Sequence, residues 1–204
     1  MIYVRLLPLI AIVLLAGCGS NGVAYAPIGG PPQCNKTNII NTGFNFAWTC
    51  WATTPTKPGA LPGFPTFTLK TSDMCVPSQN GNPFAAIEAP AGAAGYLSQQ
   101  FIDHGVSQSV SFRVWGELDP VTVRVGIVFP TGLVEGTETV LDTFAPPSVE
   151  SSPTTCSGLG PITKTYSFSR SDFNVGSLIE IRLHVTSNGV NGAIANFDDV
   201  TSSP

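Results

Sequence analysis

The chain has 204 residues, a formal net charge of −4 and only 11% charged residues. Its nine Lys and Arg residues form no basic cluster, which argues against nucleic acid as a partner. The length suits one domain with a well-buried core once the N-terminal segment is set aside.

The first 17 residues are predicted to be a signal peptide. Arg5 supplies a positive charge, and the apolar run Leu6–Gly17 is shorter than the roughly 20 residues that cross a bilayer. The four residues Leu15-Ala16-Gly17-Cys18 resemble the lipobox of bacterial lipoprotein signal peptides. The resemblance implies lipidation of Cys18 and an exported protein, anchored through lipid to the bacterial cell envelope at the outer membrane or cell surface. The alternative is an ordinary signal peptide with a chance cysteine.

Residues 18–34 are rich in Gly and Pro and almost uncharged, which is typical of a flexible tether. This leaves 35–204 as the folded domain. Without Arg5 the exported chain carries 8 basic and 13 acidic residues, a net charge of −5.

Four cysteines remain after Cys18, an even number in an exported chain, and they predict two disulfides with three pairings open. They are Cys34, Cys50, Cys75 and Cys156. We favour Cys50–Cys75, because these residues are 25 positions apart around a segment rich in Pro and Gly. A metal site on the cysteines is disfavoured, since no CxxC pair exists.

From residue 35 onward, short alternating or β-branched segments recur between turn residues, and 21 Gly with 18 Pro oppose long helices. This pattern predicts an antiparallel sandwich or barrel. A helix over 91–102 is a weak alternative to a strand there. The segments are KTNIIN, NFAWTCWA, FPTFTLK, FAAIEA, GYLSQQFI, SVSFRVWGEL, VTVRVGIVF, ETVLDTF, ITKTYSFS, SLIEIRLHV and GAIANFDDV.

Strict alternation is clearest in 110–115, 121–127 and 179–185, where apolar residues predict an inward face. The opposite face of each segment is then outward. By this parity the outward residues are Ser111, Arg113 and Trp115; Thr122, Arg124 and Gly126; and Glu180, Arg182 and His184.

Four segments in this order resemble the jelly-roll modules of the galactose-binding-like superfamily, and most closely the carbohydrate-binding modules of xylanases and glucanases. They are NIINTGFNFAW, AGYLSQQF, SVSFRVWGEL and ANFDDV. The resemblance covers roughly residues 37–201 and implies a two-sheet antiparallel jelly-roll β-sandwich. It also implies non-catalytic binding of a polysaccharide or other glycan.

Two adjacent aspartates, Asp198 and Asp199, fall in the predicted last strand, where like charges need compensation. The resemblance implies a structural calcium between the first and last strands, and the matching positions are Asn45 and Asp198. Calcium accepts such oxygen ligands in flexible geometry. Asn45 stands where the family usually has a carboxylate, so affinity should fall. The alternative is that the aspartates accept hydrogen bonds from backbone N–H groups at a turn.

Candidate sugar-binding residues follow from their chemistry, because aromatic rings can stack on the apolar faces of sugars while polar planar groups bond to hydroxyls. The candidates are Trp51, Tyr96, Gln100, Arg113, Trp115, Arg124 and Arg182. If their strands share one sheet, they form a groove for a glycan. The alternative places the aromatic rings in the core or at sheet edges.

Catalytic motifs with a nucleophile elbow, a zinc-binding helix or a phosphate loop are missing from the sequence. Asp103 and His104 are adjacent, but a surface turn explains them better than a catalytic dyad. The acids Glu88, Glu117, Asp119 and Glu180 cannot be paired from the sequence.

We therefore expect a lipid-anchored, non-enzymatic carbohydrate-binding protein. The alternative is a structural or adhesion sandwich that contacts protein partners, and the third is a hydrolase that acts on glycans.

Overall fold

The computed structural model describes a β-sandwich. It covers residues 34, 38–39, 42–57, 59, 63–76, 82–102, 107–117, 119–129, 137–169 and 177–204. The predicted signal peptide, most of the tether, Cys18 and the Asp103–His104 pair lie outside these ranges. None of the described residues forms a helix, and thus none forms one that could cross a membrane.

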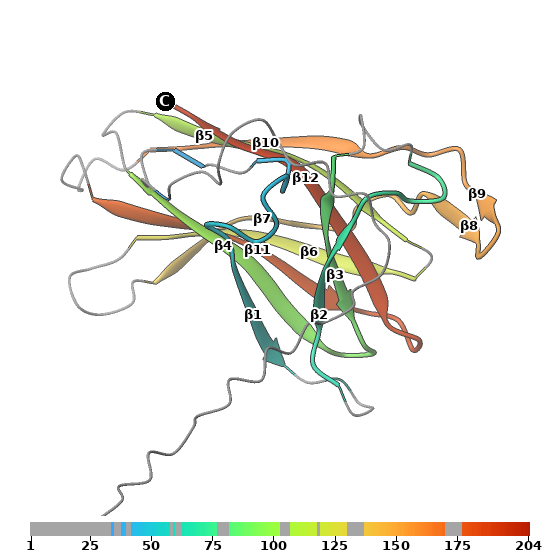
Figure 1. Ribbon diagram of the computed structural model, residues 1–204. Helices are drawn as coiled ribbons and strands as arrows, with labels where there is room; N and C mark the ends of the chain where they lie inside the picture. The colour runs from blue at the N-terminus through green and yellow to red at the C-terminus, as the bar shows by residue number, and fades with distance from the viewer. Residues whose placement is uncertain are drawn as a thin grey trace, which may run out of the picture.

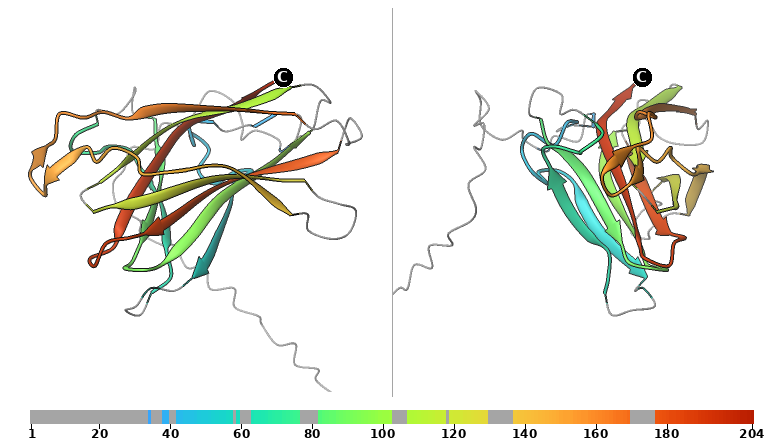
Figure 2. Two further views of the ribbon diagram at one scale, coloured as in Figure 1. Left: turned by 180° about the vertical axis from the view of Figure 1, so that it is seen from behind. Right: turned by 90° about the vertical axis from the view of Figure 1, so that its right-hand side faces the viewer.

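Two five-stranded antiparallel sheets face each other, which confirms the predicted jelly-roll sandwich (Figures 1 and 2). The first sheet has the order β1 (Ala52–Lys57), β4 (Ala94–Ile102), β11 (Leu178–Ser187), β6 (Val121–Val128) and β7 (Glu138–Phe144). The second has the order β10 (Ile162–Phe168), β5 (Gln108–Gly116), β12 (Ala193–Ser203), β3 (Phe84–Ala89) and β2 (Thr66–Lys70). A short hairpin, β8 (Glu150–Ser152) and β9 (Thr155–Cys156), projects at one end (Figure 1).

The inward faces of both sheets form one hydrophobic core, as the alternation predicts. On β11 the inward residues Ile179, Ile181, Leu183 and Val185 are fully buried, and each contributes about 1.5–3 kcal/mol by leaving water. The helix considered for 91–102 is wrong, because its second part is strand β4. Residues 95, 97, 99 and 101 are buried at the two-residue period of a strand, and Ser98 between them is buried as well.

The segment before β1 differs from the prediction of a strand over NFAWTCWA. Residues 42–50 form successive turns, with positive φ at Phe44, Ala47 and Cys50. The turns bring the buried rings of Phe44 and Trp51 together, with centroids 5.3 Å apart. A backbone hydrogen bond from Val200 N to Thr42 O (3.1 Å) joins this segment to the last strand.

Two disulfides are present as predicted, but the favoured Cys50–Cys75 pairing is wrong. The bonds are Cys34–Cys50 and Cys75–Cys156, with Cα–Cα distances of 5.5 and 5.4 Å. Cys50 lies directly before β1 of the first sheet, whereas Cys75 follows β2 of the second. Separation along the chain cannot show which Cβ atoms meet in space, and that condition decides the pairing.

The prediction that Trp115 is an exposed platform is also wrong. Trp115 does lie on the outer face of β5, but it is 1% exposed because a second hydrophobic cluster with Val76, Phe84 and Val149 covers it. Its Nε1 donates to Asp73 Oδ2 at 2.9 Å. Alternation identifies the face of a strand but does not reveal loops that fold over that face.

We predict that Trp115→Ala lowers the free energy of unfolding by about 3–5 kcal/mol, the usual cost of truncating a buried large aromatic residue. Trp115→Phe keeps most of the ring but loses the bond to Asp73, so its loss should be smaller. Chemical denaturation measures both, with exposed Thr163→Ala as the control. An unchanged midpoint for Trp115→Ala would show that the ring is not part of a stabilising cluster.

Candidate functional site

Polar and aromatic side chains gather on the outer face of the first sheet. Register places Tyr96, His184 and Arg124 in one row across β4, β11 and β6. Gln100 lies beside Glu180 in a parallel row. We call this surface the Tyr96 face and define it as Tyr96, Gln100, Arg124, Glu138, Glu180, Arg182 and His184.

The ring of Tyr96 is held by its neighbours on β11. Its centroid is 4.8 Å from that of the His184 ring and 4.9 Å from Arg182 Cζ, a distance at which a cation–π contact forms. Arg182 Nε donates to Glu180 Oε1 at 2.8 Å, and Gln100 Nε2 donates to Glu180 Oε2 at 3.5 Å. These contacts orient an aromatic ring, a guanidinium and an amide toward one surface.

Glu138 on the edge strand β7 reaches across β6 to the centre of the face. Its Oε1 lies 2.9 Å from His184 Nε2 and 3.3 Å from Arg124 Nη2, and its Oε2 lies 3.7 Å from Arg182 Nη1. Gly126 makes this path possible, because a Cβ at that position would overlap the Glu138 side chain. The edge strand thus organises the face.

The ionic groups of the Tyr96 face balance each other, with two arginines against two glutamates. The pKa of His184 is lowered, mainly because burial disfavours the charged ring. The negative charge of Glu138 raises this pKa, whereas the positive charges of Arg124 and Arg182 lower it further. Arg124 Nη2 also lies 3.2 Å from both ring nitrogens of His184. A neutral imidazole can accept a bond from this guanidinium.

A hollow of about 210 Å³ lies at one end of the Tyr96 face. Ser98, Gln100 and Glu180 line it, together with the Cys34–Cys50 disulfide. The face therefore continues into a concave surface beside the turns that precede β1.

The structure divides the predicted sugar-binding residues between two sheets and the core. Tyr96, Gln100, Arg124 and Arg182 meet on the Tyr96 face. Arg113 and Trp115 lie on β5 of the second sheet, so the prediction that they share one groove with the other residues is wrong. Trp51 is buried in the core, so its prediction as a sugar-binding residue is wrong as well. Parity along one strand cannot tell which sheet the strand joins.

Sequence reasoning placed Gly126 outward but missed the roles of Glu138 and Gly126 at this face. The sequence contains one weak indication of the role of Gly126. A glycine at an outward position of an otherwise regular strand often marks the close approach of another group. The strand of Glu138 was recognised, but its place beside β6 depends on the sheet order.

The predicted calcium ligands Asn45 and Asp198 do lie near each other. A Cβ built on Gly43 would be 3.6 Å from Asn45 Nδ2 and 3.8 Å from Asp198 Oδ1. Arg113 Nη1, however, lies 3.6 Å from a carboxylate oxygen of both Asp198 and Asp199 and offsets part of their charge. Burial and the neighbouring Asp199 still raise the pKa of Asp198 to about 6. The donor set fits in part, with one amide and one carboxylate, so calcium at this position stays a proposal.

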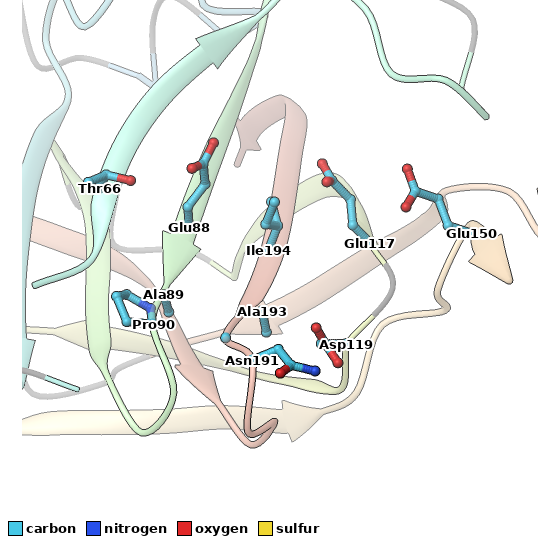
Figure 3. Close-up of a pocket in the computed structure, with 11 residues that line it drawn as sticks. Thr66, Glu88, Ala89, Pro90, Glu117, Asp119, Glu150, Asn191, Ala193 and Ile194 are labelled. Atoms are coloured by element: carbon cyan, nitrogen blue, oxygen red, sulfur yellow. The ribbon is translucent and has the colours of Figure 1, made fainter. Parts of the chain in front are cut away.

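A second cavity, of about 330 Å³, lies over the outer face of the second sheet. Figure 3 shows Glu88, Glu117 and Glu150 on neighbouring segments with their carboxylates pointing to the same side, and Asp119 below them. The sequence left Glu88, Glu117 and Asp119 unpaired, whereas the structure brings them together and adds Glu150. Lys70 Nζ lies 2.6 Å from Glu117 Oε1 and 4.0 Å from Glu88 Oε1.

Comparisons with known proteins support the fold. No protein-family model matches the chain, and no curated protein matches it. Among solved structures, the carbohydrate-binding module TmCBM61 in complex with β-1,4-galactotriose has a TM-score of 0.54 and 15% identity over 81% of this chain and 96% of that one. A cyclase from Fischerella sp. TAU in complex with 4-(1H-indol-3-yl)butan-2-one has a TM-score of 0.51 and 15% identity over 82% and 96%. The resemblance to jelly-roll carbohydrate-binding modules is thus confirmed at the level of the fold.

We predict that stability falls as the pH drops below about 6.5, the ordinary pKa of histidine. His184 has a lowered pKa in the folded protein, so protons bind the unfolded chain more tightly and favour it in acid. His184→Gln should flatten this dependence between pH 7 and 5. Equal slopes for both proteins in denaturant titrations would contradict the assignment.

The calcium proposal predicts that EDTA lowers the melting temperature and that Asp198→Ala removes this sensitivity. A free calcium concentration of 100 times the dissociation constant would raise the free energy of unfolding by about 2.7 kcal/mol. The measurement compares calcium-saturated and fully chelated protein. Identical melting curves would exclude the ion and leave Arg113 as the compensating charge.

Proposed function

We propose that this domain binds carbohydrate without catalysis and that the Tyr96 face is its binding surface. The observation that carries the proposal is the set of ordered planar groups on adjacent strands: the ring of Tyr96, the guanidinium of Arg182 and the amide of Gln100. An aromatic ring can stack on the apolar C–H face of a sugar. Guanidinium and amide groups offer paired hydrogen bonds to neighbouring hydroxyls.

Mutual contacts hold these groups before any ligand arrives. Because Arg182 is bonded to Glu180 and near Glu138, its side chain has already lost most of its freedom. A ligand then binds at a lower entropic cost, which favours affinity. The balanced ionic groups suit an uncharged sugar, since they offer donors and acceptors without a net field.

Fold likeness leaves binding and catalysis open, because the same fold occurs in TmCBM61 and in a cyclase. The contacts of the face support a binding role. Glu138 and Glu180 both lie within ion-pair distance of Arg182, so they hold the same guanidinium in place. Glycoside cleavage instead needs two carboxyl groups that flank the scissile bond of the sugar.

We propose further that a lipid on Cys18 anchors the domain to a bacterial cell envelope. The lipobox resemblance supports this proposal, and the two disulfides fit an oxidising compartment. An anchored domain of this kind would hold a polysaccharide at the cell surface or attach the cell to it.

We predict that residues 34–204 are retained by at least one polysaccharide in affinity electrophoresis against plant, fungal and bacterial glycans. Tyr96→Ala and Arg182→Ala should weaken this retention roughly tenfold or more, about 1.4 kcal/mol, by removing the stacking ring or the paired donors. Thr163→Ala, on the opposite sheet, is the matched surface control.

Thermal unfolding of each variant separates binding from folding, since the Tyr96 face lies outside the core. Retention lost with an unchanged melting temperature supports the proposal. If the wild-type domain binds no glycan but captures a defined protein of the envelope, the adhesion alternative replaces it. Release of sugar from any polymer would indicate a hydrolase instead.

The anchor proposal predicts that Cys18→Ala moves the protein from the membrane fraction to the soluble fraction or blocks its processing. Lipid attachment at Cys18 is expected to alter gel mobility as well. Membrane association and mobility that match the wild type would count decisively against lipidation.

A further inference from the structure

A histidine at the centre of the Tyr96 face is in contact with ionic side chains from three strands. In the register of the sheet, His184 on β11 lies between Tyr96 of β4 and Arg124 of β6. Glu138 reaches the ring from β7, and Arg182 lies two residues before His184 on β11 itself. Among the described residues, these are the titratable and charged side chains that face the ring.

The two ring nitrogens of a neutral His184 have different roles. Nε2 lies 2.9 and 3.0 Å from the two carboxylate oxygens of Glu138, which accept and do not donate, so the proton of the neutral ring belongs on this nitrogen. Nδ1 then carries a lone pair and accepts a hydrogen bond from Arg124 Nη2 at 3.2 Å. The neutral ring thereby links a guanidinium to a carboxylate.

Protonation of Nδ1 reverses one of these two contacts. An imidazolium carries a hydrogen on both nitrogens, so it has no lone pair left for the guanidinium of Arg124. Its positive charge also repels that guanidinium, which lies 3.2 Å away. The contact between Nε2 and Glu138 becomes stronger instead, because it now joins opposite charges.

Arg124 is the side chain that can move away from the protonated ring. Its side chain is 42% exposed, whereas those of His184 and Arg182 are 12% and 13% exposed. Arg182 is held by Glu180 at 2.8 Å. Arg124 lies 3.3 Å from Glu138, the carboxylate that the protonated ring attracts more strongly. Protonation therefore weakens both contacts of Arg124 at the centre of the face.

Protonation also changes the net charge of the surface. With a neutral His184, Arg124 and Arg182 balance Glu138 and Glu180. A protonated ring adds one positive charge, so three cations face two carboxylates and the sum becomes +1. A guanidinium released from the ring can donate two parallel hydrogen bonds to one carboxylate or sulfate group.

We propose that protonation of His184 releases Arg124 and converts the Tyr96 face into a binding site for acidic glycans, which carry carboxylate or sulfate groups. The inference rests on the proposed function in one respect, because it takes this face as the glycan-binding surface. It adds a ligand class, since the balanced face near neutral pH suits uncharged sugars and the positive face in mild acid suits anionic ones.

Linkage fixes the direction of the effect. Burial and the two arginines lower the pKa of His184 in the free protein, so the ring is neutral near pH 7 and gains its proton below about pH 6.5. An acidic glycan that prefers the protonated ring must in turn raise the pKa of His184, because the coupling between proton and ligand is reciprocal. Acidic glycans should therefore bind more tightly as the pH falls.

An NMR titration of the isotopically labelled protein without glycan tests the switch by itself. The ring signals of His184 and the guanidinium signals of Arg124 should change with a common midpoint below about pH 6.5, and the change at Arg124 should be absent in His184→Gln. The matched control is His104→Gln, which removes the other histidine of the chain, outside the described residues. Arg124 signals that stay constant while His184 titrates would overturn the switch.

Affinity electrophoresis at constant ionic strength tests the ligand class with three polymers of one backbone: dextran, dextran sulfate and carboxymethyl dextran. Retention by at least one of the two acidic polymers should strengthen roughly tenfold between pH 7 and pH 5, with no such rise for dextran. The rise should persist in His104→Gln and disappear in His184→Gln and Arg124→Gln. The acidic polymer that shows it identifies the acid group.

Two results would overturn the acidic-glycan assignment alone. One is a rise that survives in His184→Gln, which would follow from the overall charge of the protein. The other is retention of a neutral glycan without any gain for the acidic polymers in acid. If no glycan, neutral or acidic, is retained at any pH, the proposed function and the ligand class fail together, even where Arg124 moves with His184.

Discussion

The structure depends on the burial of every second residue of its central strands. On β11, four aliphatic side chains fill the space between the sheets, and the residues between them must face outward. Two packed sheets therefore create two outer faces that point away from each other. Functional side chains on different sheets cannot cooperate at one site, however close their strands are in sequence.

The chain has few charged side chains, and some of them contact more than one ionic partner. Charged residues make up 11% of the chain. Glu138 contacts Arg124, Arg182 and His184. Arg113 contacts both Asp198 and Asp199. Partly buried ions need such partners because they have lost part of their hydration. The cavity on the second sheet differs from this pattern, because Lys70 lies near both Glu88 and Glu117 while Asp119 and Glu150 line the same cavity.

Small structural features control which outer surface is accessible. Gly126 leaves room for a glutamate from the edge strand, and without that space the Tyr96 face would lose its central acceptor. On the other sheet, the loop after β2 and the segment at Val149 cover Trp115, so a potential stacking ring becomes part of a hydrophobic cluster. One sheet thus presents its aromatic side chain and the other buries it.

Whereas the choice of a two-layer sandwich over a barrel rested on the family resemblance, the sequence by itself determined the all-β class and the inward or outward direction of residues in the regular strands. These properties follow from the two-residue period of a strand, which is local. It also placed Arg124 and Arg182 outward, and the family resemblance placed the last strand near Asn45. Tertiary structure alone decided the cysteine pairing, the burial of Trp115, the reach of Glu138 and the meeting of Glu88, Glu117 and Glu150. Each of these depends on which strands are neighbours and which loops cover them, and contacts between distant segments set that order.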